Sequence, residues 1–306
     1  MSNDYEVEPV TDIINFGEGP HWSVDDQALY FVDMYEQLVR RYHPTTDTHT
    51  KLHIEGGPIT LVVPHKNEKN TFVVSIGRNL AAVTWPDPNQ DFSVTADDYK
   101  VLATVEQDLP DNRFNDGKCD ANGRMWAGTM SQEEDPDHHG SLYRLDGDRT
   151  ITKMVDKLTL SNGMAWTEDN TTMYHIDTNE YKVNAFTFDL TTGTISDRRV
   201  VIDFQEAGLA PAKPDGMTID TDGNLWVAGF GSGTIFNIEP SSGKVLRKVG
   251  ELPSSETTSV SWGGPDLDHL FITTGAGPVY RVTGLGVKGR PGASCTVELP
   301  DVATTQ

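Results

Sequence analysis

Residues 112–130 read Asn112-Arg113-Phe114-Asn115-Asp116-Gly117-Lys118-Cys119-Asp120-Ala121-Asn122-Gly123-Arg124-Met125-Trp126-Ala127-Gly128-Thr129-Met130. This stretch contains a polar turn, the start of a strand, a tight Asp-x-Asn-Gly turn and a second strand. Taken alone, it predicts an ordinary β-hairpin with polar ends. The rest of the chain repeats the same layout several times, so the hairpin is one copy of a larger repeating unit.

The repeat consists of a polar turn followed by a short strand with an aromatic residue. Six copies occur, 42 to 54 residues apart, and their aromatic residues are Tyr30, Phe72, Trp126, Tyr174, Trp226 and Phe271. Further alternating strands follow within several units, as at 140–145, 182–188 and 233–238. Units of about this length with about four strands each are typical of β-propeller blades. We therefore expect an all-β, six-bladed β-propeller; a pair of β-sandwiches is the alternative.

Length and composition agree with an all-β chain. The 306 residues include 28 Gly and 17 Pro, and no window shows a sustained apolar period near 3.6. Propellers of this length form one unit. We expect a single domain over residues 1–306 with a core from about 7 to 292, and frayed ends at 1–6 and 301–306.

Charge and cysteine content exclude several classes of protein. A formal net charge of −22 argues against nucleic acid as a partner, because phosphate binding needs clustered Lys and Arg. The two cysteines, Cys119 and Cys295, lack the spacing of a disulfide framework or a thiolate zinc site. Neither a signal peptide nor a membrane-spanning apolar run is visible. We expect a cytoplasmic monomer that contacts no membrane.

Oxygen-bearing side chains stand at matching positions of three repeats. Glu18, Asn162 and Asp215 each lie 11 or 12 residues before the aromatic residue of their unit, and each is followed by glycine. The leading ends of the first strands of propeller blades converge at one face, so these side chains should meet near the axis. Converging oxygen atoms repel one another unless a cation is present, and such ligands suit Ca²⁺, Mg²⁺ or Mn²⁺. The alternative is that each residue only caps a turn.

Five motifs carry a resemblance to a known family. They are Gly17-Glu18-Gly19-Pro20-His21-Trp22, Asn112-Arg113-Phe114-Asn115-Asp116-Gly117-Lys118, Ser161-Asn162-Gly163-Met164-Ala165-Trp166, Pro214-Asp215-Gly216-Met217 and Thr283-Gly284-Leu285-Gly286-Val287-Lys288-Gly289. In this order they resemble the regucalcin (senescence marker protein), gluconolactonase and luciferin-regenerating enzyme family. The likeness runs from about residue 7 to 292, and the overall pattern is most similar to the animal regucalcin and insect luciferin-regenerating branch.

The resemblance implies a six-bladed propeller that hydrolyses a sugar lactone such as gluconolactone. It implies one divalent metal, with Ca²⁺ expected first and Zn²⁺, Mn²⁺ or Mg²⁺ as alternatives. The residue roles that it implies are metal ligation by Glu18, Asn162 and Asp215, substrate binding by Arg113 and Asn115, and a further substrate contact from Glu133 or Glu134, of which Glu133 matches better.

The chemistry of such a site is metal-assisted attack of water on the lactone carbonyl. A general base must take a proton from the water, and the candidates are Asp215 and Asp116. Arg113 offers forked donors to sugar hydroxyls or to the carboxylate product, unless it forms a surface ion pair. Other readings are a luciferin-regenerating-type hydrolase on the same site, or a non-enzymatic calcium-binding propeller. We expect His138-His139 to face solvent and Cys119 to be buried packing.

Overall fold

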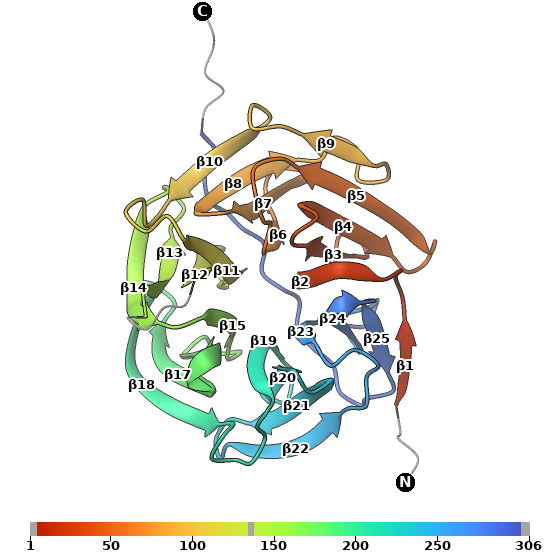
Figure 1. Cartoon of the computed structure of the whole chain (residues 1–306), viewed down its shortest axis with the longest axis vertical. Helices are drawn as coiled ribbons and strands as arrows, with labels where there is room; N and C mark the ends of the chain where they lie inside the picture. The colour runs from red at the N-terminus through yellow and green to blue at the C-terminus, as the bar shows by residue number, and fades with distance from the viewer. Residues whose placement is uncertain (1–4, 134–137, 301–306) are drawn as a thin grey trace, which may run out of the picture.

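The computed structural model describes residues 5–133 and 138–300, and β-sheets arranged about a common centre make up its regular structure (Figure 1). The described residues contain no α-helix and a single 3-10 turn, η1 (Thr178–Glu180). None of their helical segments is long and apolar enough to cross a membrane. The all-β prediction is confirmed.

Four sheets have four strands each, and in every one the strand nearest the centre comes first in sequence. They are β6 (Val62–Pro64), β7 (Thr71–Ile76), β8 (Asn79–Thr84) and β10 (Tyr99–Thr104); β11 (Asn112–Cys119), β12 (Met125–Ser131), β13 (Gly140–Leu145) and β14 (Ile151–Leu158); β15 (Ser161–Trp166), β16 (Thr172–Asp177), β17 (Lys182–Asp189) and β18 (Thr194–Asp203); β19 (Lys213–Ile219), β20 (Leu225–Phe230), β21 (Thr234–Glu239) and β22 (Lys244–Val249). This layout is consistent with propeller blades.

The first and last parts of the chain share a nine-stranded sheet. Its strands are β2 (Ile14–Ser23), β3 (Ala28–Asp33), β4 (Leu38–His43), β5 (Thr48–Ile54), β9 (Phe92–Val94), β23 (Thr257–Gly263), β24 (His269–Gly277), β25 (Tyr280–Thr283) and β1 (Glu6–Pro9). β2 joins β24 through two residue pairs, and β1 pairs along β25. The N-terminal strand thus completes the C-terminal group. The expectation of a frayed end through Glu6 is wrong at Glu6, because this residue pairs with Thr283.

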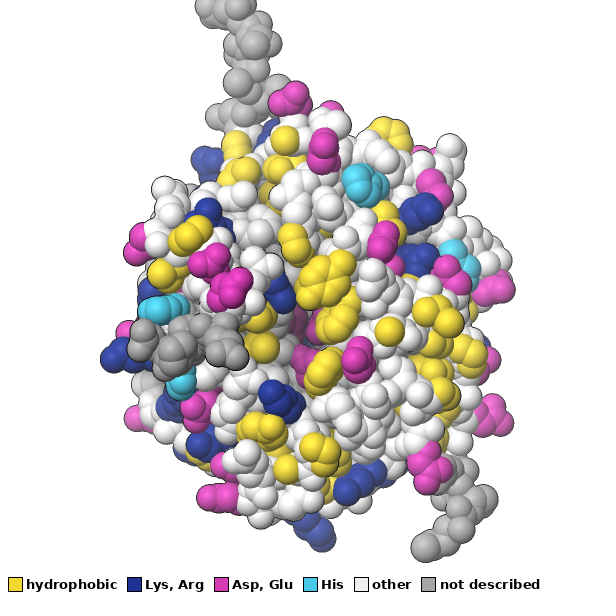
Figure 2. Space-filling view, viewed as in Figure 1, with side chains coloured by type: hydrophobic (Ala, Val, Ile, Leu, Met, Phe, Trp, Pro, Cys, Tyr) yellow, Lys and Arg dark blue, Asp and Glu magenta, His cyan; other side chains and the backbone are white. Residues whose placement is uncertain are grey.

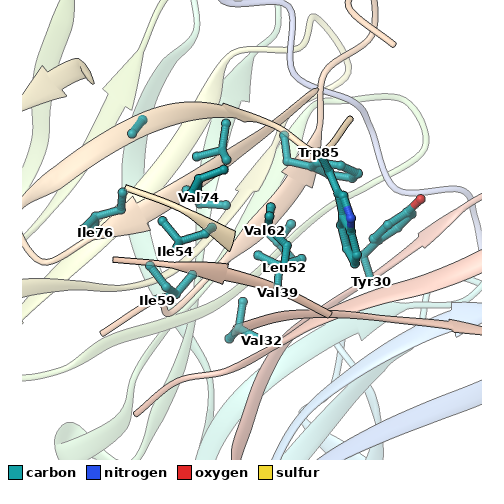
Figure 3. Packing of buried hydrophobic residues seen from close by; sticks show 14 of the residues in the cluster. Tyr30, Val32, Val39, Leu52, Ile54, Ile59, Val62, Val74, Ile76 and Trp85 are labelled. Atoms are coloured by element: carbon teal, nitrogen blue, oxygen red, sulfur yellow. The ribbon is translucent and has the colours of Figure 1, made fainter. Parts of the chain in front are cut away.

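The six aromatic residues of the repeat each lie on the second strand of their group and are buried. Some of them join neighbouring groups: the rings of Tyr30 and Phe72 lie 4.7 Å apart, and those of Trp226 and Trp262 lie 5.3 Å apart. Figure 3 shows Tyr30 and Trp85 in the cluster to which Phe72 also belongs. Each buried side chain of this size contributes about 1.5–3 kcal/mol, so these contacts hold adjacent sheets together.

The hydrogen bonds of the Asp-x-Asn-Gly turn explain why an aspartate precedes the aromatic residue in two of the repeats. Oδ1 of Asp120 accepts hydrogen bonds from the backbone of Asn122 and Arg124, and its Oδ2 accepts one from the indole of Trp126 at 2.9 Å. Asp220 makes the same contacts in its own turn, including one to Trp226 at 2.8 Å. One carboxylate therefore closes the turn and fixes the aromatic side chain that follows it.

Candidate active site

The strands nearest the centre, here called the inner strands, are β2, β6, β11, β15, β19 and β23 (Figure 1). Four of them lose register with their second strand where a predicted site residue stands. The shifts lie between Glu18 and His21, Phe114 and Gly117, Ser161 and Met164, and Pro214 and Met217. A β-bulge turns side chains away from the regular alternation, so each one directs site residues toward the centre.

The glycines after the site residues allow the inner strands to approach closely. A Cβ on Gly163 would lie 2.6 Å from the backbone oxygen of Asp215, and one on Gly216 would lie 1.9 Å from Oγ of Ser259. Real Cβ atoms do not come so close to other atoms. In the Asn-Gly and Asp-Gly pairs, the first residue therefore supplies a polar side chain, and the glycine allows the neighbouring inner strand to pack closely against the backbone.

The inner strands bring three carboxyl groups together in the buried centre. Glu18, Asp116 and Asp215 are 8%, 2% and 6% exposed. Burial raises the pKa of Glu18 well above its ordinary value, and the charges of Asp215 and Asp116 raise it further. Burial and then Asp116 raise the pKa of Asp215 in the same way. Figure 2 shows acidic side chains at the base of a hollow at the centre of this face.

Two oxygen atoms of this cluster have no hydrogen-bond partner among the described residues. They are Oδ1 of Asn162 and Oδ2 of Asp116, both buried. The amide nitrogen of Asn162 donates to Oγ1 of Thr178 at 3.1 Å, and the proximity of Asn162 to Asp215 lowers the pKa of that carboxyl against the larger effect of burial. Buried acceptors are rarely left unpaired in native proteins, so these oxygens fit a site for a positively charged group.

The donor set fits a hard divalent cation with an amide oxygen among its ligands. Nowhere in residues 5–133 and 138–300 do three or more His, Cys, Asp and Glu side chains form a group that could hold a metal ion. A site with three protein ligands built on Glu18 and Asp215 would thus need a third ligand of another residue type, and the unpartnered Oδ1 of Asn162 is a candidate. Such all-oxygen ligation is typical of Ca²⁺ and Mg²⁺.

Arg113 and Asn115 lie beside the carboxyl cluster and contact one another. The Arg113 guanidinium is 6% exposed and donates to the backbone oxygen of Phe114 at 2.9 Å and to Oδ1 of Asn115 at 2.8 Å. Asn115 in turn donates to the backbone oxygen of Ser161 on the next inner strand. Burial lowers the pKa of Arg113, while Tyr35 and Glu18 raise it. The pair forms one wall of the centre.

Glu133, the better match of the two acidic residues predicted to contact substrate beyond Met130, is not brought into this cluster. Glu133 is exposed, and its backbone nitrogen donates to Oγ of Ser131 at 3.3 Å. Glu134 lies outside the described residues. Of the other expectations, Cys119 is buried as predicted, at 6% exposed; His139 is exposed as predicted, while His138 is half-buried.

Sequence reasoning missed an aromatic group at this face, which we call the aromatic rim: Phe16, Tyr35 and Phe230. The ring of Phe16 lies 5.7 Å from that of Tyr35 and 6.5 Å from that of Phe230. Tyr35 is 54% exposed and lies near enough to Arg113 to raise the pKa of the guanidinium. Phe16 stands two residues before Glu18, so strand alternation could have placed it on the same side. Nothing local in the sequence points to the other two.

Comparison with known proteins identifies the family of this chain. Residues 16–276 match the model of the SMP-30/gluconolactonase/LRE-like region, so the chain belongs to that family. It is 38% identical to regucalcin from Xenopus laevis over 92% of this chain and 94% of that protein.

Two solved structures are similar to this one. A luciferin-regenerating enzyme is 34% identical, with a TM-score of 0.89 over 96% of this chain and 100% of the other. A regucalcin from Agrobacterium tumefaciens, described as a calcium-binding protein, shares the fold at 21% identity, with a TM-score of 0.83 over 95% and 97% of the chains. Family membership supports a lactonase or a related hydrolase.

Proposed function

We propose that this chain is a divalent-metal-dependent lactonase that opens sugar lactones such as gluconolactone. The observation that carries the proposal is the buried oxygen cluster: Glu18, Asp215 and the unpartnered Oδ1 of Asn162 stand at matching bulges of three inner strands. A cation held there would supply a Lewis acid for the lactone carbonyl and stabilise the charge that develops on its oxygen.

The residues around the cluster supply the proton transfer and the binding contacts. Asp215 or Asp116 takes a proton from the attacking water, since both carboxyls lie in the buried cluster beside the proposed cation. Arg113 and Asn115 orient the hydroxyl groups of the lactone, and Glu133 adds a contact at the outer edge. The bond between the carbonyl carbon and the ring oxygen breaks, which leaves a hydroxy acid.

The oxygen-only donor set favours Ca²⁺ as the bound ion, ahead of Mn²⁺, Mg²⁺ and Zn²⁺. We further propose one domain of six blades acting as a monomer. The nine-stranded sheet holds two four-strand groups, β2–β5 and β23–β25 with β1, and these add to the four separate sheets.

The aromatic rim favours a second candidate on the same site. Phe16, Tyr35 and Phe230 present apolar ring surface next to Arg113, which would suit a substrate with an aromatic body better than a polyhydroxylated sugar. A hydrolase of the luciferin-regenerating type would have this preference. A purely calcium-binding protein would need neither Arg113 nor the rim.

The test compares gluconolactone with the aromatic lactone dihydrocoumarin, using protein stripped with EDTA and resupplied with each metal. We expect gluconolactone opening that depends on added metal and is lost in Asp215→Ala. Preferential opening of dihydrocoumarin, with kcat/KM lowered selectively by Tyr35→Ala, would favour the second candidate. Metal-independent turnover, or full activity in Asp215→Ala, would contradict both.

A further inference from the structure

A second cavity lies further along the inner strands than the carboxyl cluster. It has a volume of about 550 Å³. On each of four inner strands its lining residues follow the site residue by two to four positions: His21 after Glu18, Lys118 after Asp116, Trp166 after Asn162, and Thr218 after Asp215. At about 3.3 Å per residue, the cavity lies roughly 7–13 Å from the cluster along the axis.

The C-terminal segment closes one side of this cavity. Residues 289–293 line it, and the segment is held by isolated bridges from Gly289 to Asp220 and from Ala293 to Cys119. Gly292 lies so close to His21 that an added Cβ would be 2.8 Å from its ring. Residues 289–293 therefore form one wall of the cavity, and the two bridges hold that wall in place. The volume of the cavity falls within the range of small-molecule sites.

Its lining includes two cations, Lys118 and Arg290, and one carboxylate, Glu168. Lys118 is partly exposed on a strand at the centre of the molecule, and its ammonium donates to the backbone oxygen of Met217. An ammonium has three N–H groups, so this bond uses one of them. At the outer edge Arg290 pairs with Glu168 at 2.9 Å, and the Glu168 side chain is 81% exposed, which shows that the cavity reaches solvent. Pro20, Met164, Ile219 and Pro291 supply apolar lining.

We propose that this cavity binds a small organic carboxylate with an apolar body, the carboxylate lying on Lys118 and the body against the apolar lining. Charge-assisted hydrogen bonds from Lys118 would hold the head group. The pair of Arg290 and Glu168 would stand at the entrance. Lys118 lies between this cavity, which it lines, and the carboxyl cluster, because the charges of Asp116 and Glu18 also act on its ammonium.

The test is calorimetric titration of the full-length protein with hexanoate, with hexan-1-ol as the neutral counterpart. We expect hexanoate to bind at one site. Hexan-1-ol should bind with an affinity that is lower by about tenfold or more. Lys118→Met should weaken hexanoate binding by about tenfold or more, while Lys153→Met, on the outer strand β14, should not change it.

Two further variants guard against binding elsewhere and against misfolding. Asp215→Asn, which alters the carboxyl cluster, should still bind hexanoate, and Thr218→Trp, which fills the cavity without removing a charge, should not. Unfolding temperatures of all variants confirm that they are folded. Binding that survives both Lys118→Met and Thr218→Trp, binding that is lost only in Asp215→Asn, or no binding by the wild type would each overturn the proposal.

Discussion

Asp116 has an environment unlike that of its neighbour Asp120. Both carboxyls are almost fully buried, but Asp120 accepts hydrogen bonds from Arg124 and Trp126, whereas Oδ2 of Asp116 has no partner among the described residues. Burial raises the pKa of Asp116, although Lys118 and the backbone of Gly117 lower it. When folding raises the pKa of a carboxyl, the folded state loses stability as pH rises above the pKa that this carboxyl has in the unfolded chain. The reason is that ionisation of the buried carboxyl costs free energy.

Asp116→Asn should therefore stabilise the metal-free protein at pH 7, by about 1–2 kcal/mol. The amide keeps the shape and an acceptor for the Gly117 backbone while it removes a charge that repels Glu18 and Asp215. Urea unfolding in EDTA measures the change. Asp120→Asn is the matched control and should destabilise, because it weakens the bonds to Arg124. Loss of stability in Asp116→Asn would show that its charge is structurally required.

The residues that line the centre could be predicted from sequence to different degrees. Glu18, Asn162 and Asp215 were found because a repeat places equivalent residues at equivalent points. Lys118 was missed, since one lysine in an acidic chain gives no local signal. Tyr35 and Phe230 lie in a turn and at a strand end of different sheets, and only the arrangement of the sheets brings them together.

At the scale of the elements, β15 and β16 are linked beside a bulge by a buried histidine. His175 is 1% exposed, and its Nε2 lies 2.8 Å from Oγ of Ser161, next to Asn162. Burial, and then the charge of Arg198, lower the pKa of His175 from 6.5 to about 3. The unfolded chain takes up this proton at higher pH than the folded one. Stability from the neutral ring is thus complete above about pH 6.5 and is lost as pH falls toward 3.

His175→Gln should make the fold less sensitive to acid. Between pH 7.5 and 4.5 we expect the loss of unfolding free energy to shrink by roughly 2–3 kcal/mol relative to the wild type. Urea unfolding at the two pH values measures this. Some acid sensitivity should remain in this variant, because burial lowers the pKa of His21 to about 4 and His21 is unchanged. His49→Gln, at a side chain that is 44% exposed, is the control. An unchanged pH dependence in His175→Gln would contradict the account.

The bulges themselves were beyond sequence reasoning. The Asn-Gly and Asp-Gly pairs predicted turns or close backbone contact, but the register shifts depend on packing between inner strands that are distant in sequence. The path of residues 289–293 across the centre was missed for the same reason, because its bridges to Asp220 and Cys119 follow no repeat. By contrast, the second strands were predictable, since each has its own turn and aromatic residue.

At the scale of the whole molecule, the first strand completes the last group of strands. β1 is exposed along its length. It therefore contributes to the stability of the fold through its pairing with β25 and through the ion pair of Glu8 with Arg281. Deleting residues 1–9 should lower the unfolding temperature by about 2–6 °C. Scanning calorimetry measures this, and deletion of residues 1–4, which leaves β1 whole, is the control. An unchanged unfolding temperature would mean that the β1–β25 pairing adds nothing to stability.

We propose that three inner strands hold one divalent ion through Glu18, Asn162 and Asp215. Calcium titration of EDTA-treated protein by calorimetry measures this binding. We predict one tight site in the wild type, weakened about tenfold or more by Asn162→Ala and by Asp215→Asn. Asn237→Ala, which changes a buried asparagine on β21 outside the site, should retain it. Equal binding by the wild type and both site variants, or no binding by the wild type to any divalent ion, would contradict the account.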